Sequence, residues 1–227
     1  EKGPGFRALN LRVNDLLRQW VKDSVLDAVK LLEKDRIESR KEEPVRMSRE
    51  MTVSKSVSDM EFADTMSNLG VLFQKNGESQ EALQCHKKAA EVYQSLNSKS
   101  GIAKACTNIG AVLQGMGLLD SALARHRRAL SIRVAANGHD DVTTALSLYS
   151  IASVLFEQGH HSDALVHGRK ALAIVESTYG LNHADTGASY NLVGMIHLQH
   201  GDYNDALQHT RKGLQIREAT LGIYHPD

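Results

Sequence analysis

The chain has 227 residues, with 27 acidic and 27 basic side chains and a formal net charge of zero. This balance produces no long-range field, so we expect neither nucleic acid nor an anionic membrane as a partner. No stretch approaches the ~18 consecutive apolar residues of a membrane-spanning helix, and no signal peptide opens the chain. We therefore expect no membrane insertion and a cytoplasmic location.

Residues 1–44 are predicted to contain a long amphipathic helix. Apolar residues recur there at steps of three and four, as one apolar helix face requires: Leu9, Val13, Leu16, Leu17, Trp20, Val25, Leu26, Val29 and Leu32. A stripe of this length marks a contact surface, so we expect Leu16 and Trp20 to be buried against protein. Three arrangements remain open: the helix caps the next domain, docks in that domain's groove, or pairs with another molecule.

Residues 45–60 are predicted to form a flexible linker. Pro44 ends any preceding helix, because proline cannot donate the backbone hydrogen bond that a helix interior needs. The following stretch is rich in serine and threonine, which is typical of flexible connections between domains. We therefore expect a separate C-terminal domain over residues 61–227.

A repeated pattern fills that C-terminal domain. An apolar residue and a small residue are followed by glycine seven positions later and alanine five after that. The small residues are Gly70, Gly110, Ala152 and Gly194, at intervals of 40, 42 and 42. A period of this size indicates stacked supersecondary units, here two helices joined by a glycine turn. It predicts four repeats, at about 63–102, 103–144, 145–186 and 187–226.

The connectors between the later repeats are also alike. They read Gly-His-Asp-Asp-Val at 138–142, Gly-Leu-Asn-His-Ala-Asp at 180–185 and Gly-Ile-Tyr-His-Pro-Asp at 222–227. With the repeated helices, they resemble the tetratricopeptide-repeat family and its kinesin-light-chain and nephrocystin-like subgroup. We expect Asp141 and Asp185 to cap the helices that follow them. The last connector would lead into a further helix, so we expect the array to continue beyond residue 227.

The resemblance implies an all-α fold, a right-handed α-solenoid of helix-turn-helix repeats preceded by the long amphipathic helix. It also implies that the first helices line a concave groove that holds another polypeptide. A helical projection places Asp64, Ser67, Leu146 and Leu198 on the inward side. The main candidates are Asn68, Gln74, Lys104, Asn108, Gln114, Tyr149, Ser150, Phe156, Asn191, Leu192 and Met195. Amides could bond a peptide backbone in the first two repeats, and apolar side chains could bury anchor residues in the last two.

The sequence shows no constellation of residues for catalysis and no phosphate-binding loop, so we expect no enzyme activity and no cofactor. His197 and His200 are three residues apart, a spacing that suits a metal ion. No carboxylate or cysteine completes a site within the sequence pattern, so we expect no bound metal. His86 and His126 occupy equivalent repeat positions, and we expect them to serve packing.

The sequence therefore predicts a non-enzymatic adaptor or scaffold that binds a peptide or helix of a partner protein in the groove. The N-terminal helix could regulate this binding. Two alternatives remain open. The chain could be a structural module that forms homo-oligomers through the N-terminal helix or the open end of the array. It could also be a regulatory domain of a larger enzyme.

Overall fold

The computed structural model describes residues 30, 34 and 49–221, with side chains placed between 59 and 220 in the continuous stretch. The chain divides into two compact units, Glu1–Val57 and Ser58–Asp227, and the second unit carries the repeats. The predicted N-terminal helix, with Leu16 and Trp20, lies outside the described residues, as does the connector at 222–227. These two expectations stay predictions.

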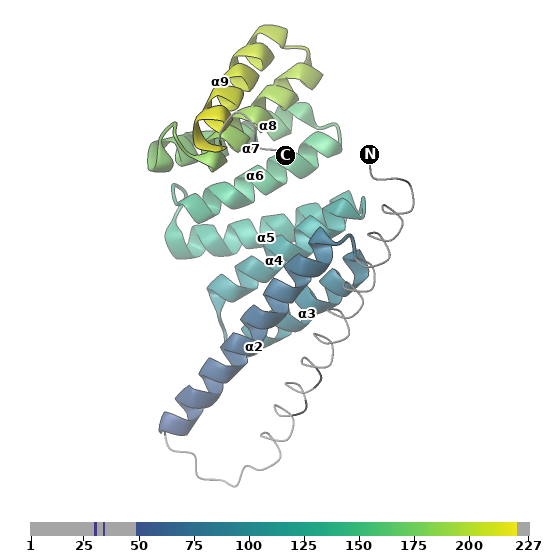
Figure 1. The fold of residues 1–227 in the computed structure, drawn as a ribbon, viewed down its shortest axis with the longest axis vertical. Coiled ribbons are helices and arrows are strands. Elements are labelled where there is room, and N and C mark those ends of the chain that lie inside the picture. The colour runs from purple at the N-terminus through teal and green to yellow at the C-terminus, as the bar shows by residue number, and fades with distance from the viewer. Residues whose placement is uncertain (1–29, 31–33, 35–48, 222–227) are drawn as a thin grey trace, which may run out of the picture. The chain divides into compact units, whose positions relative to one another are not determined.

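Helices alone make up the regular structure of the stretch 49–221, and they occur in pairs (Figure 1). The first and second helices of the four successive pairs are α2 (Arg49–Lys75) and α3 (Ser79–Ser95), α4 (Lys99–Gly115) and α5 (Leu119–Asn137), α6 (Val142–Glu157) and α7 (His161–Tyr179), and α8 (Ala184–His200) and α9 (Tyr203–Leu221). The predicted all-α solenoid is confirmed.

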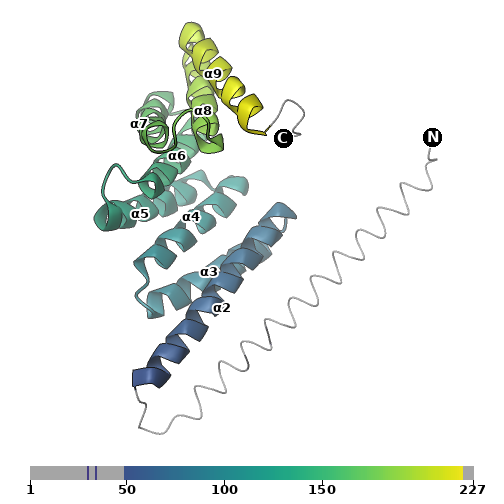
Figure 2. The same ribbon diagram turned by 60° about the vertical axis from the view of Figure 1, so that its left-hand side comes forward.

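The pairs stack in chain order, as Figures 1 and 2 show for the helices from α3 to α9. From α3 to α9 each helix packs on the next one along the chain, and α6 also contacts both α4 and α8 directly. The first helices therefore form one continuous layer. One apolar core runs through this stack from Ile109 in α4 to Ile216 in α9. Each helix in the described part of the chain lacks the length or the apolar character that crossing a bilayer demands.

The turn inside each repeat follows the sequence prediction. Gly77, Gly117, Gly159 and Gly201 all have positive φ, between 75° and 93°. Glycine adopts this left-handed conformation without the steric cost that a β-carbon imposes. The chain reverses there and lays the second helix against the first.

The two helices of a repeat meet where residue sizes are complementary. A β-carbon on Gly70 would lie 2.5 Å from Cε1 of His86, and one on Gly110 would lie 2.6 Å from Cε1 of His126. The third repeat reverses the sizes, since Ala152 of the first helix faces Gly168 of the second. The two helices approach closely in each case because at least one partner is very small.

The structure corrects two local predictions. Residues 49–60 lie in α2 and not in a linker, because this stretch has neither proline nor glycine to interrupt a helix. The N-cap of α8 is His183, whose Nδ1 accepts a hydrogen bond from the backbone N–H of Asp185 at 3.2 Å. Asp185 therefore lies inside the first turn, where its charge complements the helix dipole. Asp141 caps α6 as predicted.

The repeat boundaries also move, because α4, α6 and α8 begin before the predicted starts at 103, 145 and 187. The shorter first interval has a simple origin. Helix α3 has 17 residues, whereas α5, α7 and α9 each have 19.

Candidate functional site

The candidate site is the surface formed by the solvent-facing residues of α2, α4, α6 and α8, here called the first-helix surface. Successive first helices place equivalent residues side by side, about 40 positions apart in the sequence. The side chains on this surface differ between its two halves. The half formed by α2 and α4 has polar side chains at the predicted groove positions, while Leu72 of α2 is also 56% exposed. The half formed by α6 and α8 exposes apolar groups at these positions.

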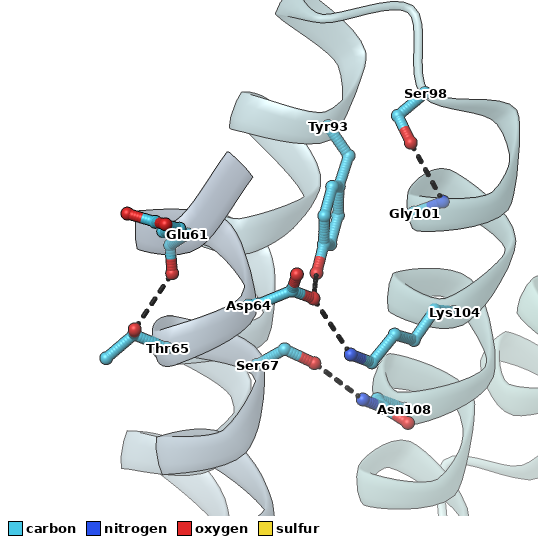
Figure 3. Close-up of polar contacts among 9 residues, drawn as sticks. All are labelled: Glu61, Asp64, Thr65, Ser67, Tyr93, Ser98, Gly101, Lys104 and Asn108. Atoms are coloured by element: carbon cyan, nitrogen blue, oxygen red, sulfur yellow. Dashed lines mark hydrogen bonds and ion pairs between the residues drawn. The ribbon is translucent and has the colours of Figure 1, made fainter. Parts of the chain in front are cut away.

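The polar half is held together by hydrogen bonds within and between repeats. Asp64 of α2 accepts a hydrogen bond of 2.7 Å from the hydroxyl of Tyr93 and pairs with Nζ of Lys104 at 3.0 Å (Figure 3). These two bonds, the tyrosine's first, lower the pKa of the Asp64 carboxyl. Burial, followed by the bond to Asp64, raises the pKa of Tyr93. Tyr93 is a partner that the sequence projection missed, because it comes from the second helix α3.

Two further polar residues of α4 bond to neighbouring first helices. Asn108 donates to the hydroxyl of Ser67 on α2 at 3.1 Å (Figure 3). Gln114 donates to the hydroxyl of Ser153 on α6 at 3.0 Å and also to the carboxylate of Glu157. These amides were predicted to meet a peptide backbone. In the structure they already join one repeat to the next.

The other half of the surface presents large apolar side chains to solvent. Leu146 of α6 is 51% exposed, and Met195 and Leu198 of α8 are 40% and 53% exposed. For two of them, the equivalent residue one repeat earlier bonds between first helices: Leu146 matches Lys104, and Met195 matches Ser153. The apolar groups therefore occupy the same surface, without polar contacts to make there. Neighbouring exposed apolar groups of this kind mark interaction sites.

The predicted groove residues fall into three classes of exposure. Asn68, Lys104 and Met195 are exposed, and those that are partly buried are Gln74, Asn108, Gln114, Tyr149, Ser150, Phe156 and Asn191. Leu192 is only 4% exposed and belongs to the core. It is not available as a surface anchor, because the apolar side chain at this position of α8 turns into the packed stack. Tyr149 and Phe156 also pack on that core with part of their surface.

Two stretches of the chain match a model of the tetratricopeptide repeat over residues 101–177 and 166–219, and a second model with the same description matches residues 62–100. These matches cover the helix pairs described above. The chain belongs to the tetratricopeptide-repeat family. No curated protein matches the chain significantly.

Among solved structures, this tetratricopeptide array is similar to BtubC (BKLC) from P. vanneervenii, at 18% identity and a TM-score of 0.64, over 97% of this chain and 89% of that one. It is also similar to the nearly identical TPR-like repeats assigned to a kinesin light chain of Podosopora anserina, at 18% identity and a TM-score of 0.57, over 93% and 96% of the two chains. At these identities the likeness shows the fold.

A third similar structure is aspartyl phosphate phosphatase F from Bacillus subtilis, at 17% identity and a TM-score of 0.64, over 75% of this chain and 44% of that one. Tetratricopeptide repeats in general serve protein–protein interaction, and this is the role that the family supports for the chain.

Proposed function

We propose that the chain is a non-enzymatic adaptor that binds a peptide or helix of a partner protein on the first-helix surface, anchored over α6 and α8. The exposure of Leu146, Met195 and Leu198 carries this proposal. Burying one such side chain fully on binding contributes about 1.5–3 kcal/mol. The polar groups of α2 and α4 add less, since several already bond to each other.

Substitution of the exposed leucines tests the proposal. Leu146→Glu and Leu198→Glu each place a charge where a partner's apolar side chain would be buried, at a cost that binding cannot recover. Val166→Glu on the second helix α7 is a matched control, because Val166 is also 51% exposed. Proteins captured from a lysate by the wild-type chain are expected to persist with the control and to be lost with the two leucine variants.

The same three variants should keep the wild-type circular dichroism spectrum and melting temperature, since their side chains face solvent. Equal loss of captured proteins in the Val166→Glu variant would move the binding surface to the second helices. Leu146 is a better probe than Tyr149, because Tyr149 also packs on the core and its removal would disturb folding.

We also propose that the N-terminal segment regulates the array. Its apolar stripe favours contact with protein, and removing residues 1–45 separates the three arrangements that the sequence leaves open. A gain in partner affinity indicates that the segment occupies the groove, a loss of stability indicates a cap, and a fall in mass by light scattering indicates a homo-oligomer. Blue-shifted emission from Trp20, the only tryptophan, is expected in each case.

Cys85 and Cys106 are free thiols, in keeping with the cytoplasmic location we propose.

A further inference from the structure

Histidines and carboxylates converge at the turn between α8 and α9. His197 and His200 lie in the last turn of α8, and Gly201 then reverses the chain with φ of 93°. Asp202 follows in the turn, and Asp205 lies in the first turn of α9. The sequence pattern alone showed only the two histidines, because the carboxylates come back to them through the reversal of the chain.

Three of these side chains lie close enough together to hold a single metal ion, and His200 contacts one of the three, Asp202. Oδ2 of Asp202 lies 3.0 Å from Nδ1 of His197 and 3.0 Å from Nδ1 of His200. One ligand atom from each of His197, Asp202 and Asp205 lies within 4.8 Å of the others. An ion held by bonds of about 2.0–2.2 Å needs its ligand atoms about 3–4 Å apart. Small side-chain shifts therefore suffice to bring these three ligands together. His200 would become the fourth ligand by turning its half-exposed side chain toward them.

One side of the cluster is buried in the protein, and the other side faces solvent. His197 is 1% exposed, and its ring stacks on His209 of α9 with the centroids 5.2 Å apart. Nδ1 of His209 bonds to the backbone oxygen of Asp205 at 2.8 Å. The side chains of His200 and Asp202 are 42% and 41% exposed. An ion can thus approach from solvent toward a histidine whose ring orientation is set by packing.

Arg169 of α7 makes a contact that opposes a metal. Its Nη2 lies 3.1 Å from Nε2 of His197, and because a guanidinium only donates hydrogen bonds, Nε2 must accept. The ring proton then resides on Nδ1 and is donated to Asp202. A metal at Nδ1 would require that proton to move to Nε2, because the metal-bound neutral ring carries its one proton on the other nitrogen. An N–H at Nε2 cannot face the N–H donors of Arg169. Arg169 is exposed and can turn into solvent, at some loss of metal affinity.

We propose that His197, His200, Asp202 and Asp205 form a binding site for a divalent transition metal of the zinc class. Arg169 opposes metal binding, because it favours the His197 tautomer that carries its proton on Nδ1. Two imidazole nitrogens with two carboxylates favour zinc, cobalt or nickel over magnesium and calcium, which prefer oxygen ligands. The site would join α8 to α9 at the turn inside the fourth repeat.

Titration with zinc against a chromophoric chelator tests this proposal, with cobalt absorption as the second readout. The wild-type chain is expected to bind one zinc ion with micromolar affinity at pH 7.5. His200→Gln and Asp205→Asn should each weaken this affinity about tenfold or more, whereas His167→Gln on α7 should leave it unchanged.

The decisive variant is Arg169→Gln. Glutamine offers a carbonyl that accepts from the Nε2 proton of metal-bound His197, and such outer contacts change metal affinity about 10–100-fold. We expect zinc to bind about tenfold more tightly and to raise the melting temperature more than in the wild type. Weaker or unchanged binding in Arg169→Gln, equal loss in His167→Gln, or no stoichiometric zinc binding would each overturn the proposal. Partner capture is independent of this result, because Leu146 and Leu198 are not part of the cluster.

Discussion

His86 and His126 are completely buried, and neither nitrogen of either ring has a hydrogen-bond partner among the described residues. A buried polar group left in this state costs about 1–3 kcal/mol. Burial lowers the pKa of each imidazole to about 4, with a smaller contribution from Lys104 for His86 and from Arg133 for His126. Both rings are therefore neutral in the folded protein near pH 7, and their role is packing against glycine.

Acid should destabilise the array through these two histidines. In the unfolded chain each takes up a proton near pH 6.5, whereas in the folded chain it does so only near pH 4. The contribution of each neutral ring to the free energy of unfolding is thus fully present above pH 6.5. It is lost as the pH drops toward 4, by about 3 kcal/mol for each ring. Urea unfolding at pH 7.5, 5.5 and 4.5 measures this loss.

The variant His86→Met/His126→Met provides the control for the acid effect. Methionine fills a similar volume without a titrating group, so its free energy of unfolding should vary much less between pH 7.5 and 4.5. An equally steep decline in this variant would assign the acid sensitivity to other groups.

The glycines that face these rings should not tolerate a methyl group. Gly110→Ala would bring Cβ to 2.6 Å from Cε1 of His126, and overpacking of this kind costs about 1–3 kcal/mol. Gly115→Ala in the same helix meets no atom within 4 Å and should be neutral or slightly stabilising, because alanine is the better helix former. Thermal and urea unfolding of both variants check this difference.

A double variant distinguishes a steric effect from a backbone effect. If contact with the ring causes the loss, then Gly110→Ala combined with His126→Ala should be more stable than the sum of the single changes predicts. Strict additivity would show that the methyl group and the ring do not meet.

At the scale of single elements, the start of α6 depends on one aspartate. Asp141 accepts a hydrogen bond from the backbone N–H of Thr143 at 2.8 Å, and its contacts with Thr143, the side chain first, lower the pKa of the carboxyl. Asp141→Ala should lower the melting temperature by a few degrees, since it removes the cap. Asp185→Ala should have a smaller effect, because His183 caps α8. Differential scanning calorimetry compares the two, and equal shifts would contradict these assignments.

The helices and their pairing were predictable because glycine turns, small crossing residues and a constant period are local signals. The start of α2 was not, because its serines and threonines suit a linker as well as an exposed helix. At the site, Asn68 and Met195, which the projection placed in the groove, are exposed. The projection could not foresee that Leu192 turns into the core or that Asn108 bonds to Ser67, since both depend on how neighbouring repeats are spaced.

At the scale of the whole array, equivalent leucines contribute differently to the free energy of unfolding in different repeats. Leu172 of α7 is 7% exposed under the following repeat, whereas its equivalent 42 positions later, Leu214 of α9, is 55% exposed. Leu172→Glu should cost more than about 3 kcal/mol, because it buries an unpaired charge. Leu214→Glu should change the free energy of unfolding by less than about 0.5 kcal/mol. Urea unfolding followed by circular dichroism measures both, and a large loss from Leu214→Glu would show that α9 is covered in solution.

The complementary sizes where paired helices cross have a consequence for the evolution and engineering of this array. The second helices carry His86, His126, Gly168 and Thr210 at one repeat position, and the first helices carry Gly70, Gly110, Ala152 and Gly194 opposite them. The repeats are therefore not interchangeable modules. Grafting α5 in place of α7 would drive an imidazole into the methyl group of Ala152. Duplication or recombination is tolerated only when the break falls between repeats, so that the first and second helices of one repeat stay together. A consensus repeat averaged from the four copies would lose this matching.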